Sequence, residues 1–287
     1  MCDQDHFDED RKEFEDRGLV TRKQFGALLG AGMVMMLPKV ANAAAVSESE
    51  VVVTTPDGSA DCYFVHPASG TAPGVLLWPD IFGLRPAMRQ MGKRLAESGY
   101  SVLVVNPFYR TKKAPTADNG ASTPIAQVMP LAQSLNETTH MTDAKAFIGW
   151  LDKQASVAKN KKMGTQGYCM GGPMAFRTAV AMPDRVGAVA SFHGGGLVRG
   201  DAPNSPHIQA AKTHAQFLIA IGDNDDKRAP TDKDVLKKTF AEAKLPAEIE
   251  VYGAAHGWCP PDSTVYNEAL AEKAWTRLLA LYGKALA

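Results

Sequence analysis

The sequence has no excess of charge of either sign. Its 287 residues include 31 Lys and Arg and 31 Asp and Glu, so the formal net charge at pH 7 is zero. Nucleic acids and anionic membranes attract proteins mainly through an excess of positive charge. We therefore expect no nucleic acid and no anionic membrane surface as a partner.

Internal repeats, a central linker rich in Pro and Ser, and a long apolar run are absent as well. The apolar run at residues 26–37 is shorter than the ~20 residues that a membrane-spanning helix requires. A hydrophobic content of 45% over this length is typical of one globular domain with a full-sized core. The composition favours a single folded domain.

The N-terminal segment has the features of an export signal. A charged stretch and the pair Arg22-Lys23 precede the apolar run at 26–37, and Ala-Asn-Ala at 41–43 is an A-x-A cleavage site. Thr-Arg-Lys-x-Phe resembles a twin-arginine motif in which Lys23 replaces the second arginine. A buried N-terminal helix is the alternative, but the glycines of the run disfavour it. We predict a signal at 1–43, a catalytic domain at 44–287, and a periplasmic or secreted product without stable membrane insertion.

Cysteine is scarce, and the predicted export affects how the cysteines are interpreted. Cys2 would leave with the signal, and Cys62, Cys169 and Cys259 would remain. Three cysteines in an oxidising compartment are compatible with one disulfide and a working thiol, or with three free thiols. Of the two, we favour the absence of a bridge between Cys62 and Cys259.

Short strands and helices alternate along the predicted mature chain. Strands at 50–54 and 62–66 flank a Pro-Asp-Gly turn and predict a hairpin. Further strands are expected at 74–78, 102–106, 162–166, 187–192, 216–221 and 247–252, and helices at 87–97, within 139–153, and at 173–182, 231–243 and 265–284. This order predicts an α/β fold with a mostly parallel central sheet and helices on both faces. Ligands of such sheets bind at the carboxyl ends of the strands.

The stretch Gly-Tyr-Cys-Met-Gly-Gly at residues 167–172 carries the most chemical information. It follows a predicted strand and opens a predicted helix. A nucleophile between glycines at such a turn lies on a tight bend that exposes its side chain, and a Cβ on either flank would collide with neighbouring backbone. Cys169 alone is compatible with a small buried hydrophobe. The residues that follow favour a nucleophile.

An acid and a histidine come after Cys169 in the chain. The strand at 216–221 ends in Gly-Asp-Asn-Asp-Asp, and the strand at 247–252 runs into Gly-Ala-Ala-His. Nucleophile, acid and histidine in this order, each after a strand, are typical of the α/β-hydrolase triad. Among the three aspartates we select Asp225, which stands three residues after the glycine, as the acid. His256 is the candidate base.

With these motifs the chain resembles the dienelactone hydrolase family from about Val51 to its C-terminus. The family's elbow reads G-Y-C-x-G-G, its acid lies in G-x-x-D and its histidine in G-x-x-H, and each pattern occurs here. A fourth motif, an acidic residue before Ile-Phe-Gly, is matched at residues 80–83. The resemblance implies an enzyme with an α/β-hydrolase fold that hydrolyses small esters or lactones and uses no cofactor or metal.

The chemistry of such a reaction gives each motif residue a role. A thiol with a pKa of about 8.5 is only partly ionised at neutral pH, so Cys169 needs a base. His256 can take and return its proton, and Asp225 would fix the tautomer of the imidazole and stabilise the imidazolium. The oxyanion requires two fixed N–H donors. The backbone N–H groups of Met170, just after the nucleophile, and Ile81, on the early strand-to-helix loop, are the candidates.

The resemblance also suggests residues around the thiol and the substrate. In the family, a carboxylate at the position of Asp80 holds the resting thiol protonated; it is usually a glutamate, and a helix cap is the alternative role for the shorter Asp80. Arg110 matches one of two arginines that hold a substrate carboxylate, whereas Pro260 stands where the second is expected. Four aromatic side chains predict a pocket lining, with packing in the core as the alternative: Phe82, Tyr109, Tyr168 and Trp258. The resemblance thus implies the reaction type but not dienelactone as substrate.

Other functions were weighed against the same residues. A glutamine amidotransferase also uses G-x-C-x-G, but usually has a carboxylate two residues after the histidine, where this chain has Trp258. A binding protein that has lost turnover would keep the same triad.

Two other stretches resemble known motifs only in part. Residues 223–226 resemble the start of a calcium-binding loop, but the glycine and the glutamate that such a loop has at later positions are missing. The His-Gly-Gly-Gly stretch starting at His193 follows the nucleophile, unlike the lipase oxyanion motif. The oligomeric state is left open.

Overall fold

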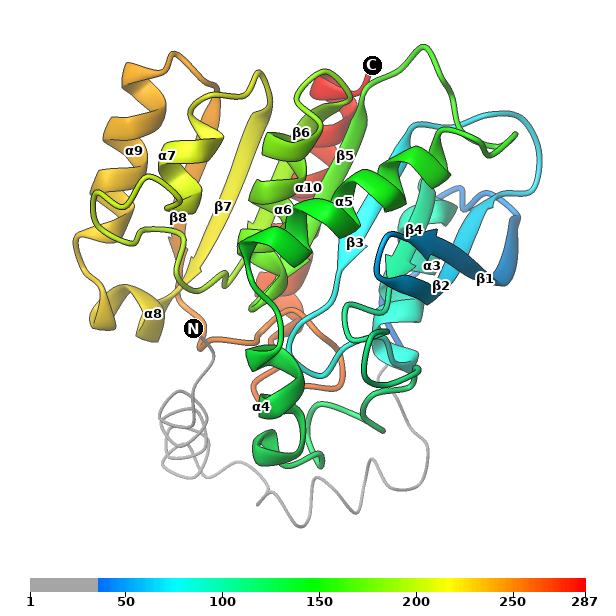
Figure 1. Cartoon of the computed structure of the whole chain (residues 1–287), viewed down its shortest axis with the longest axis horizontal. Helices are drawn as coiled ribbons and strands as arrows, with labels where there is room; N and C mark the ends of the chain where they lie inside the picture. Colours follow the sequence, from blue (N-terminus) through cyan, green and yellow to red (C-terminus); the bar gives the residue numbers. More distant parts are fainter. Residues whose placement is uncertain (1–35) are drawn as a thin grey trace.

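The computed structural model describes residues 36–287, so most of the predicted signal lies outside the described residues. Its centre is an eight-stranded sheet in the order β1-β2-β4-β3-β5-β6-β7-β8 (Figure 1). The strands are β1 Val46–Thr55, β2 Gly58–Pro67, β3 Gly74–Trp78, β4 Ser101–Val105, β5 Met163–Tyr168, β6 Val186–Phe192, β7 Gln216–Gly222 and β8 Ala247–Tyr252. Every predicted strand is present, and the largest shift of a boundary is in the hairpin.

The sheet is mostly parallel, as predicted. β1 pairs antiparallel with β2, and β2 pairs antiparallel with β4. All other neighbouring strands are parallel. The carboxyl ends of β3, β5, β7 and β8 therefore meet at one edge of the sheet, and each runs directly into a segment that carries a predicted site residue.

Helices cover both faces of the sheet (Figure 1). The helices are α3 Pro86–Glu97, α4 Ile125–Gln133, α5 Glu137–Leu151, α6 Gly171–Ala181, α7 Pro206–Ala210, α8 Asp223–Arg228, α9 Asp232–Glu242 and α10 Glu268–Ala285. Residues of α5, α6 and α9 belong to one buried cluster, and residues of α3 and α10 belong to a second. The predicted α/β architecture is confirmed.

Alternation along the strands explains the two clusters. On β4, Leu103 and Val105 belong to the cluster under α5 and α6, whereas Val102 and Val104 belong to the cluster under α3 and α10. Successive side chains of a strand point to opposite faces. Because both faces are covered, every residue of β4 is buried and the strand reads as a continuous apolar run.

Three helices were not predicted from the sequence: α4, α7 and α8. Helix α4 contains Pro130, which removes a backbone donor and normally argues against a helix interior. Its residues Ile125 and Val128 are buried in one cluster with Ile81 and Cys169. Tertiary packing therefore compensates for the weak local preference. Helix α4 lies beyond the carboxyl edge of the sheet, next to the site (Figure 1).

Side-chain caps set the start of two other helices. The side chain of Asn136 accepts a hydrogen bond from Thr139 N, so α5 begins at Glu137, before the predicted 139. The side chain of Asn267 accepts one from Leu270 N at 3.1 Å, so α10 begins at Glu268, after the predicted 265. Asparagine is among the residues preferred at the N-cap of a helix. Asn136 and Asn267 therefore mark the observed starts of α5 and α10 in the sequence.

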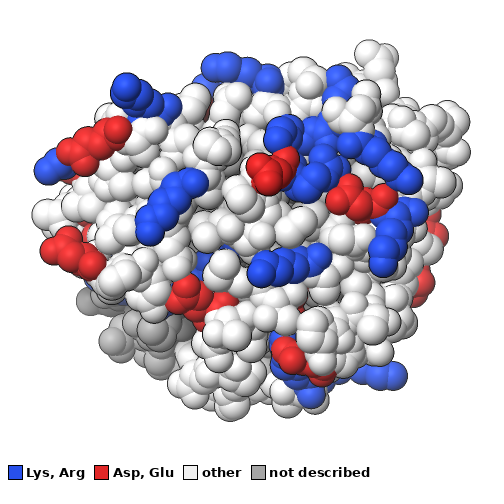
Figure 2. All heavy atoms as spheres, turned by 45° about the horizontal axis from the view of Figure 1, so that its top comes forward, with Lys and Arg blue, Asp and Glu red and all other residues white. Residues whose placement is uncertain are grey.

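Charges of both signs are mixed on the surface. On the face drawn in Figure 2, Lys and Arg side chains lie among Asp and Glu side chains rather than in one extended basic area. Within residues 36–287, no helix combines the length and the apolar character needed to cross a bilayer.

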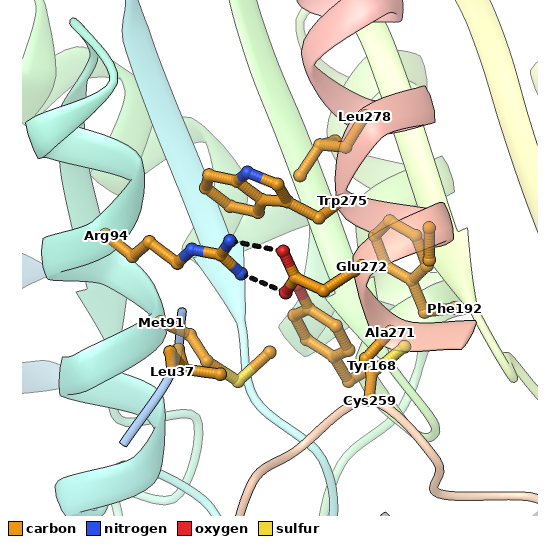
Figure 3. A pocket seen from close by; sticks show the side chains of 11 residues that line it. Leu37, Met91, Arg94, Tyr168, Phe192, Cys259, Ala271, Glu272, Trp275 and Leu278 are labelled. Carbon is orange, nitrogen blue, oxygen red and sulfur yellow. Dashed lines mark hydrogen bonds and ion pairs between the residues drawn. The ribbon is translucent and has the colours of Figure 1, made fainter. Parts of the chain in front are cut away.

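The segment before β1 runs along α3 and touches the core. Ala44 N donates a hydrogen bond to Glu97 O at 2.9 Å. Leu37 packs against the cluster between α3 and α10 and lines a small cavity of about 30 Å³ there, together with Met91 of α3 and Trp275 of α10 (Figure 3). Between Leu37 and β1, residues 41–43 are exposed.

Candidate active site

Cys169 lies at the turn between β5 and α6. Its φ is 51°, in the left-handed region that non-glycine residues rarely adopt. Two backbone hydrogen bonds hold this conformation: Cys169 N donates to Phe192 O, and Gly172 N donates to Cys169 O, each at 3.0 Å. The strained turn predicted for a nucleophile between glycines is thus present at this residue.

The glycines of the elbow are required by close backbone contacts. A Cβ on Gly167 would lie 2.0 Å from the carbonyl oxygen of Gly171. A Cβ on Gly171 would lie 2.5 Å from the carbonyl oxygen of Trp78, at the end of β3. Neither backbone oxygen can move aside without disturbing α6 or the end of β3, so only glycine allows β5, α6 and the end of β3 to meet here.

His256, on the loop after β8, is bonded to Asp225 of α8. Its Nδ1 lies 3.0 Å from Oδ1 and 2.9 Å from Oδ2 of Asp225. Gly222 leaves room for this pair, because a Cβ there would lie 2.8 Å from Asp225 Oδ2. The neighbouring aspartates have other partners: Asp223 pairs with Lys227, and Asp226 pairs with Lys233.

Asn224 also holds the histidine loop, which the sequence did not indicate. Its side-chain oxygen accepts a hydrogen bond from His256 N at 2.8 Å. The backbone of the histidine is therefore fixed by one residue of α8 and its ring by the next. Its position beside the predicted acid was the only signal in the sequence.

Cys169 and His256 line one cavity of about 40 Å³ at the carboxyl edge of the sheet. Asp80, Ile81 and Phe82, on the loop between β3 and α3, line it as well. The structure thus brings these five predicted site residues together. Met170, another predicted site residue, lines a larger neighbouring cavity that also includes Ile81.

His193 completes the wall of the small cavity and has an unusual environment. It is 1% exposed, and neither ring nitrogen has a hydrogen-bond partner among the described residues. Its ring centroid lies 4.9 Å from that of His256. Burial, and secondarily the nearby His256, hold the pKa of His193 well below its usual value, so the ring is neutral.

Comparison with known proteins agrees with this geometry. Residues 60–286 match the dienelactone hydrolase family. The chain belongs to this family. It is 26% identical over 230 residues to the carboxymethylenebutenolidase of Rhodococcus opacus, covering 78% of this chain and 86% of that protein.

Solved structures of the family share the fold. A "putative dienelactone hydrolase" from Klebsiella pneumoniae superposes with a TM-score of 0.73 at 22% identity, covering 84% of this chain and 99% of that one. A dienelactone hydrolase from Anabaena variabilis gives a TM-score of 0.60 at 15% identity, covering 84% and 99%. Together with the sheet order, these likenesses identify an α/β-hydrolase fold.

Arg110, expected from the family to contact substrate, lines neither cavity. Its guanidinium donates to both oxygens of the buried Asp143, at 2.7 and 2.8 Å, and also pairs with Asp57. Asp57 lies on the hairpin turn between β1 and β2. The contacts of Arg110 therefore connect this turn to α5 instead of reaching Cys169.

Trp258, expected to line the pocket, is fully buried behind it. Its ring stacks on Tyr252, with centroids 5.3 Å apart, and meets the ring of His193 edge-on at 5.1 Å. His193 in turn contacts His256. The contribution of Trp258 to the site is thus indirect, through the rings that it supports.

The two other cysteines are free, buried thiols, so the expected absence of a Cys62–Cys259 bridge is confirmed. Burial raises the pKa of both thiols above the usual value. Cys169 is disulfide-bonded in the structure. A cysteine acts as a nucleophile in its thiolate form, so any catalysis by this sulfur would require the reduced state.

A buried ion-pair network that the sequence did not reveal supports the cavity. Arg85, which precedes α3, is fully buried and binds Asp80 through two nitrogens at 2.7 and 2.9 Å. It binds Asp262, on the loop after His256, at 2.6 and 2.9 Å. Burial raises the pKa of Asp80, while the Arg85 guanidinium opposes that rise. The network connects the loop between β3 and α3 to the loop that carries His256.

Replacing Arg85 by methionine should lower the free energy of unfolding by about 3–5 kcal/mol, because two buried carboxylates would lose their shared partner. Urea unfolding measures this difference. Arg89→Met, in the first turns of the helix that Arg85 precedes, is the matched control: its partner Glu50 is exposed, and the expected cost is about 0–1 kcal/mol. Equal losses in the two variants would show that the buried network contributes no more than a surface pair.

Proposed function

We propose that this protein hydrolyses small esters or lactones through a thioester formed on Cys169. Membership in the dienelactone hydrolase family supports a carboxylic ester hydrolase. The observation that carries the finer proposal is that His256, bonded to Asp225, lines the same cavity as the strained Cys169. Nucleophile, base and orienting acid are the elements of covalent acyl transfer.

Acylation begins with a proton transfer. Asp225 accepts a hydrogen bond from Nδ1 of His256, which leaves Nε2 to take the thiol proton. The thiolate attacks the substrate carbonyl, and the N–H groups of Met170 and Ile81 receive the oxyanion. Met170 stands at the N-terminus of α6, where the helix dipole favours negative charge. The alcohol leaves with the proton from His256.

Deacylation reverses the roles of the same groups. His256 takes a proton from water, and the resulting hydroxide attacks the thioester carbonyl. The C–S bond breaks, the carboxylic acid departs, and the proton returns to the Cys169 sulfur. In a lactone the alcohol stays attached to the product, so the ring opens to a hydroxy acid.

Asp80 is better suited to position the oxyanion loop than to hold the resting thiol. Both of its oxygens are bound by Arg85, and Oδ1 also accepts a hydrogen bond from Phe82 N at 2.9 Å. These contacts fix the loop that carries Ile81. We propose that this positioning role replaces the gating role implied by the family's glutamate.

A substrate screen tests the proposed function. Lactones, aryl esters and thioesters should be offered to the enzyme in the presence of a reductant that keeps Cys169 as a thiol, with Cys169→Ala as the blank. We expect turnover above the blank for at least one of these classes. Ligand binding without turnover would instead favour a binding protein, and release of ammonia from glutamine would favour an amidotransferase.

We also propose that the protein is exported and matures by cleavage after Ala43. Exposure of residues 41–43 ahead of β1 would make this bond accessible to a peptidase. A chain that starts at Ala44 should therefore fold and keep the full-length rate, because Leu37, among the described residues that it removes, is only partly buried against the core cluster. N-terminal sequencing from the native envelope should give Ala44. A cytosolic protein that still starts at Met1 would contradict the export.

A further inference from the structure

A second cavity, of about 360 Å³, adjoins the catalytic one. Ile81 lines both cavities, and Met170, which follows the nucleophile, lines the larger. A substrate whose carbonyl lies at Cys169 can therefore extend part of its structure into this space. Much of the wall is apolar and comes from α4 and α6, including Met129, Pro173 and Met174.

The same cavity contains a buried arginine without a carboxylate partner. Arg177 of α6 is 2% exposed and lines the cavity. Its Nη1 lies 3.0 Å from His140 Nδ1, and its Nε has no hydrogen-bond partner. No acidic side chain among the described residues lines this cavity. Glu137 favours the charged form of Arg177 from outside this lining, and its carboxylate accepts a hydrogen bond from Gln209.

Other buried arginines of the described chain show what a structural arginine requires. Arg85 binds Asp80 and Asp262. Arg94 binds both oxygens of Glu272, as Figure 3 shows, and its guanidinium lies over the ring of Trp275. Burying a charge without such a partner is unfavourable. Arg177 therefore differs from both in having no carboxylate in hydrogen-bond contact with its guanidinium, although Glu137 acts on its charge from a longer distance.

His140 adds a second unused donor. Arginine has only donors, so Nδ1 of His140 must accept from Arg177, and the proton of the neutral ring is then on Nε2. Nε2 has no partner. Burial, with the nearby arginines, lowers the pKa of His140 to about 3, so the ring stays neutral. Arg199, exposed on the loop after β6, adds a further positive charge to the lining.

We propose that this cavity binds an anionic end of the substrate, with Arg177 as the residue that recognises it. Arg177 Nε and His140 Nε2 are hydrogen-bond donors without partners, and Arg177 is positively charged. A carboxylate is negatively charged and only accepts hydrogen bonds, so it matches both properties. Arg177 lies about two helical turns, or roughly 10 Å, beyond Met170 along α6. The substrate class is an ester or lactone with an apolar chain that ends in a carboxylate. This inference rests on the proposed hydrolase function and names its substrate class.

Paired ester substrates test the inference. Monoaryl esters of glutaric, adipic and suberic acid carry a terminal carboxylate, whereas aryl esters of pentanoic, hexanoic and octanoic acid are neutral. We expect the wild type to prefer the anionic members in kcat/KM. Arg177→Met should lower kcat/KM for anionic esters by roughly 10- to 100-fold, chiefly through KM, and change neutral esters by less than about twofold. Arg110→Met, whose contacts lie outside both cavities, should leave the preference unchanged.

A binding measurement separates this inference from the hydrolase proposal. Free suberate should raise the unfolding temperature of the Cys169→Ala protein, and it should not do so when Arg177→Met is added. Arg177→Met alone should not lower the unfolding temperature, because it removes a buried charge that no carboxylate contacts. Three results would each overturn the anion site. They are equal kcat/KM of the wild type for the two ester series, equal losses on both series in Arg177→Met, and no rise of the unfolding temperature when suberate is added to Cys169→Ala. Continued hydrolysis of neutral esters in that case would leave the hydrolase proposal intact.

Discussion

Replacing Cys169 by alanine should lower ester hydrolysis by on the order of a thousandfold or more while leaving the fold intact. The variant removes the sulfur on which the proposed thioester forms, and alanine fits the space because it is smaller than cysteine. Steady-state rates under reducing conditions on the best substrate of the screen measure the effect, and circular dichroism checks the fold.

Trapping the intermediate makes the same test specific. With a slowly hydrolysed ester, mass spectrometry should find the acyl group on the peptide that contains Cys169. Cys62→Ala is the matched control and should still form the acyl adduct. Cys62 is a buried thiol of β2, burial raises its pKa, and it lines neither of the two cavities at the site. Wild-type turnover in the Cys169→Ala protein would rule out the thioester mechanism.

The fold could be predicted because each strand has a local signature. Strands such as β3, β4 and β7 are short apolar runs bounded by turns, and β3 was placed at its observed residues 74–78. Helix α4 could not be predicted in this way, because Pro130 interrupts the local pattern and contacts with Ile81 and Cys169 stabilise it. Those contacts join segments that are far apart in the chain.

The same distinction separates the site residues that were found from those that were missed. Motif residues such as Cys169 and His256 have diagnostic neighbours within three positions. Arg85 and Asp262 are 177 residues apart, and neither stands in a recognisable pattern. Their meeting depends on how two loops approach each other, which no local spacing encodes.

Residues expected to contact substrate were the hardest to place. Arg110 and Trp258 were selected by type and by position relative to family motifs, but type does not specify the direction of a side chain. Arg110 has two aspartates as partners, and Trp258 is packed behind His193. Arg177, on the other hand, lies in a helix where it reads as an ordinary polar residue. Only the missing carboxylate partner, visible in three dimensions, sets it apart.

Replacing Asp225 by asparagine should lower kcat by on the order of a hundredfold or more. An asparagine amide can donate to Nδ1 and thereby place the imidazole proton on Nε2, the nitrogen that must accept the thiol proton. The amide also cannot stabilise the imidazolium that forms when Cys169 is ionised. Rates on one ester substrate, compared with those of the wild type, measure this effect.

Asp223→Asn is the control for that change, since the two residues are two positions apart on the same short helix. Asp223 pairs with Lys227 at the surface and not with His256, so its variant should keep nearly the full rate. Asp226, paired with Lys233, should behave in the same way. Because all three variants remove one negative charge from α8, a loss confined to Asp225→Asn assigns the effect to its bond with His256. Comparable losses in all three would instead indicate a general electrostatic effect of the acidic helix, and a larger loss in Asp223→Asn would place the catalytic acid there.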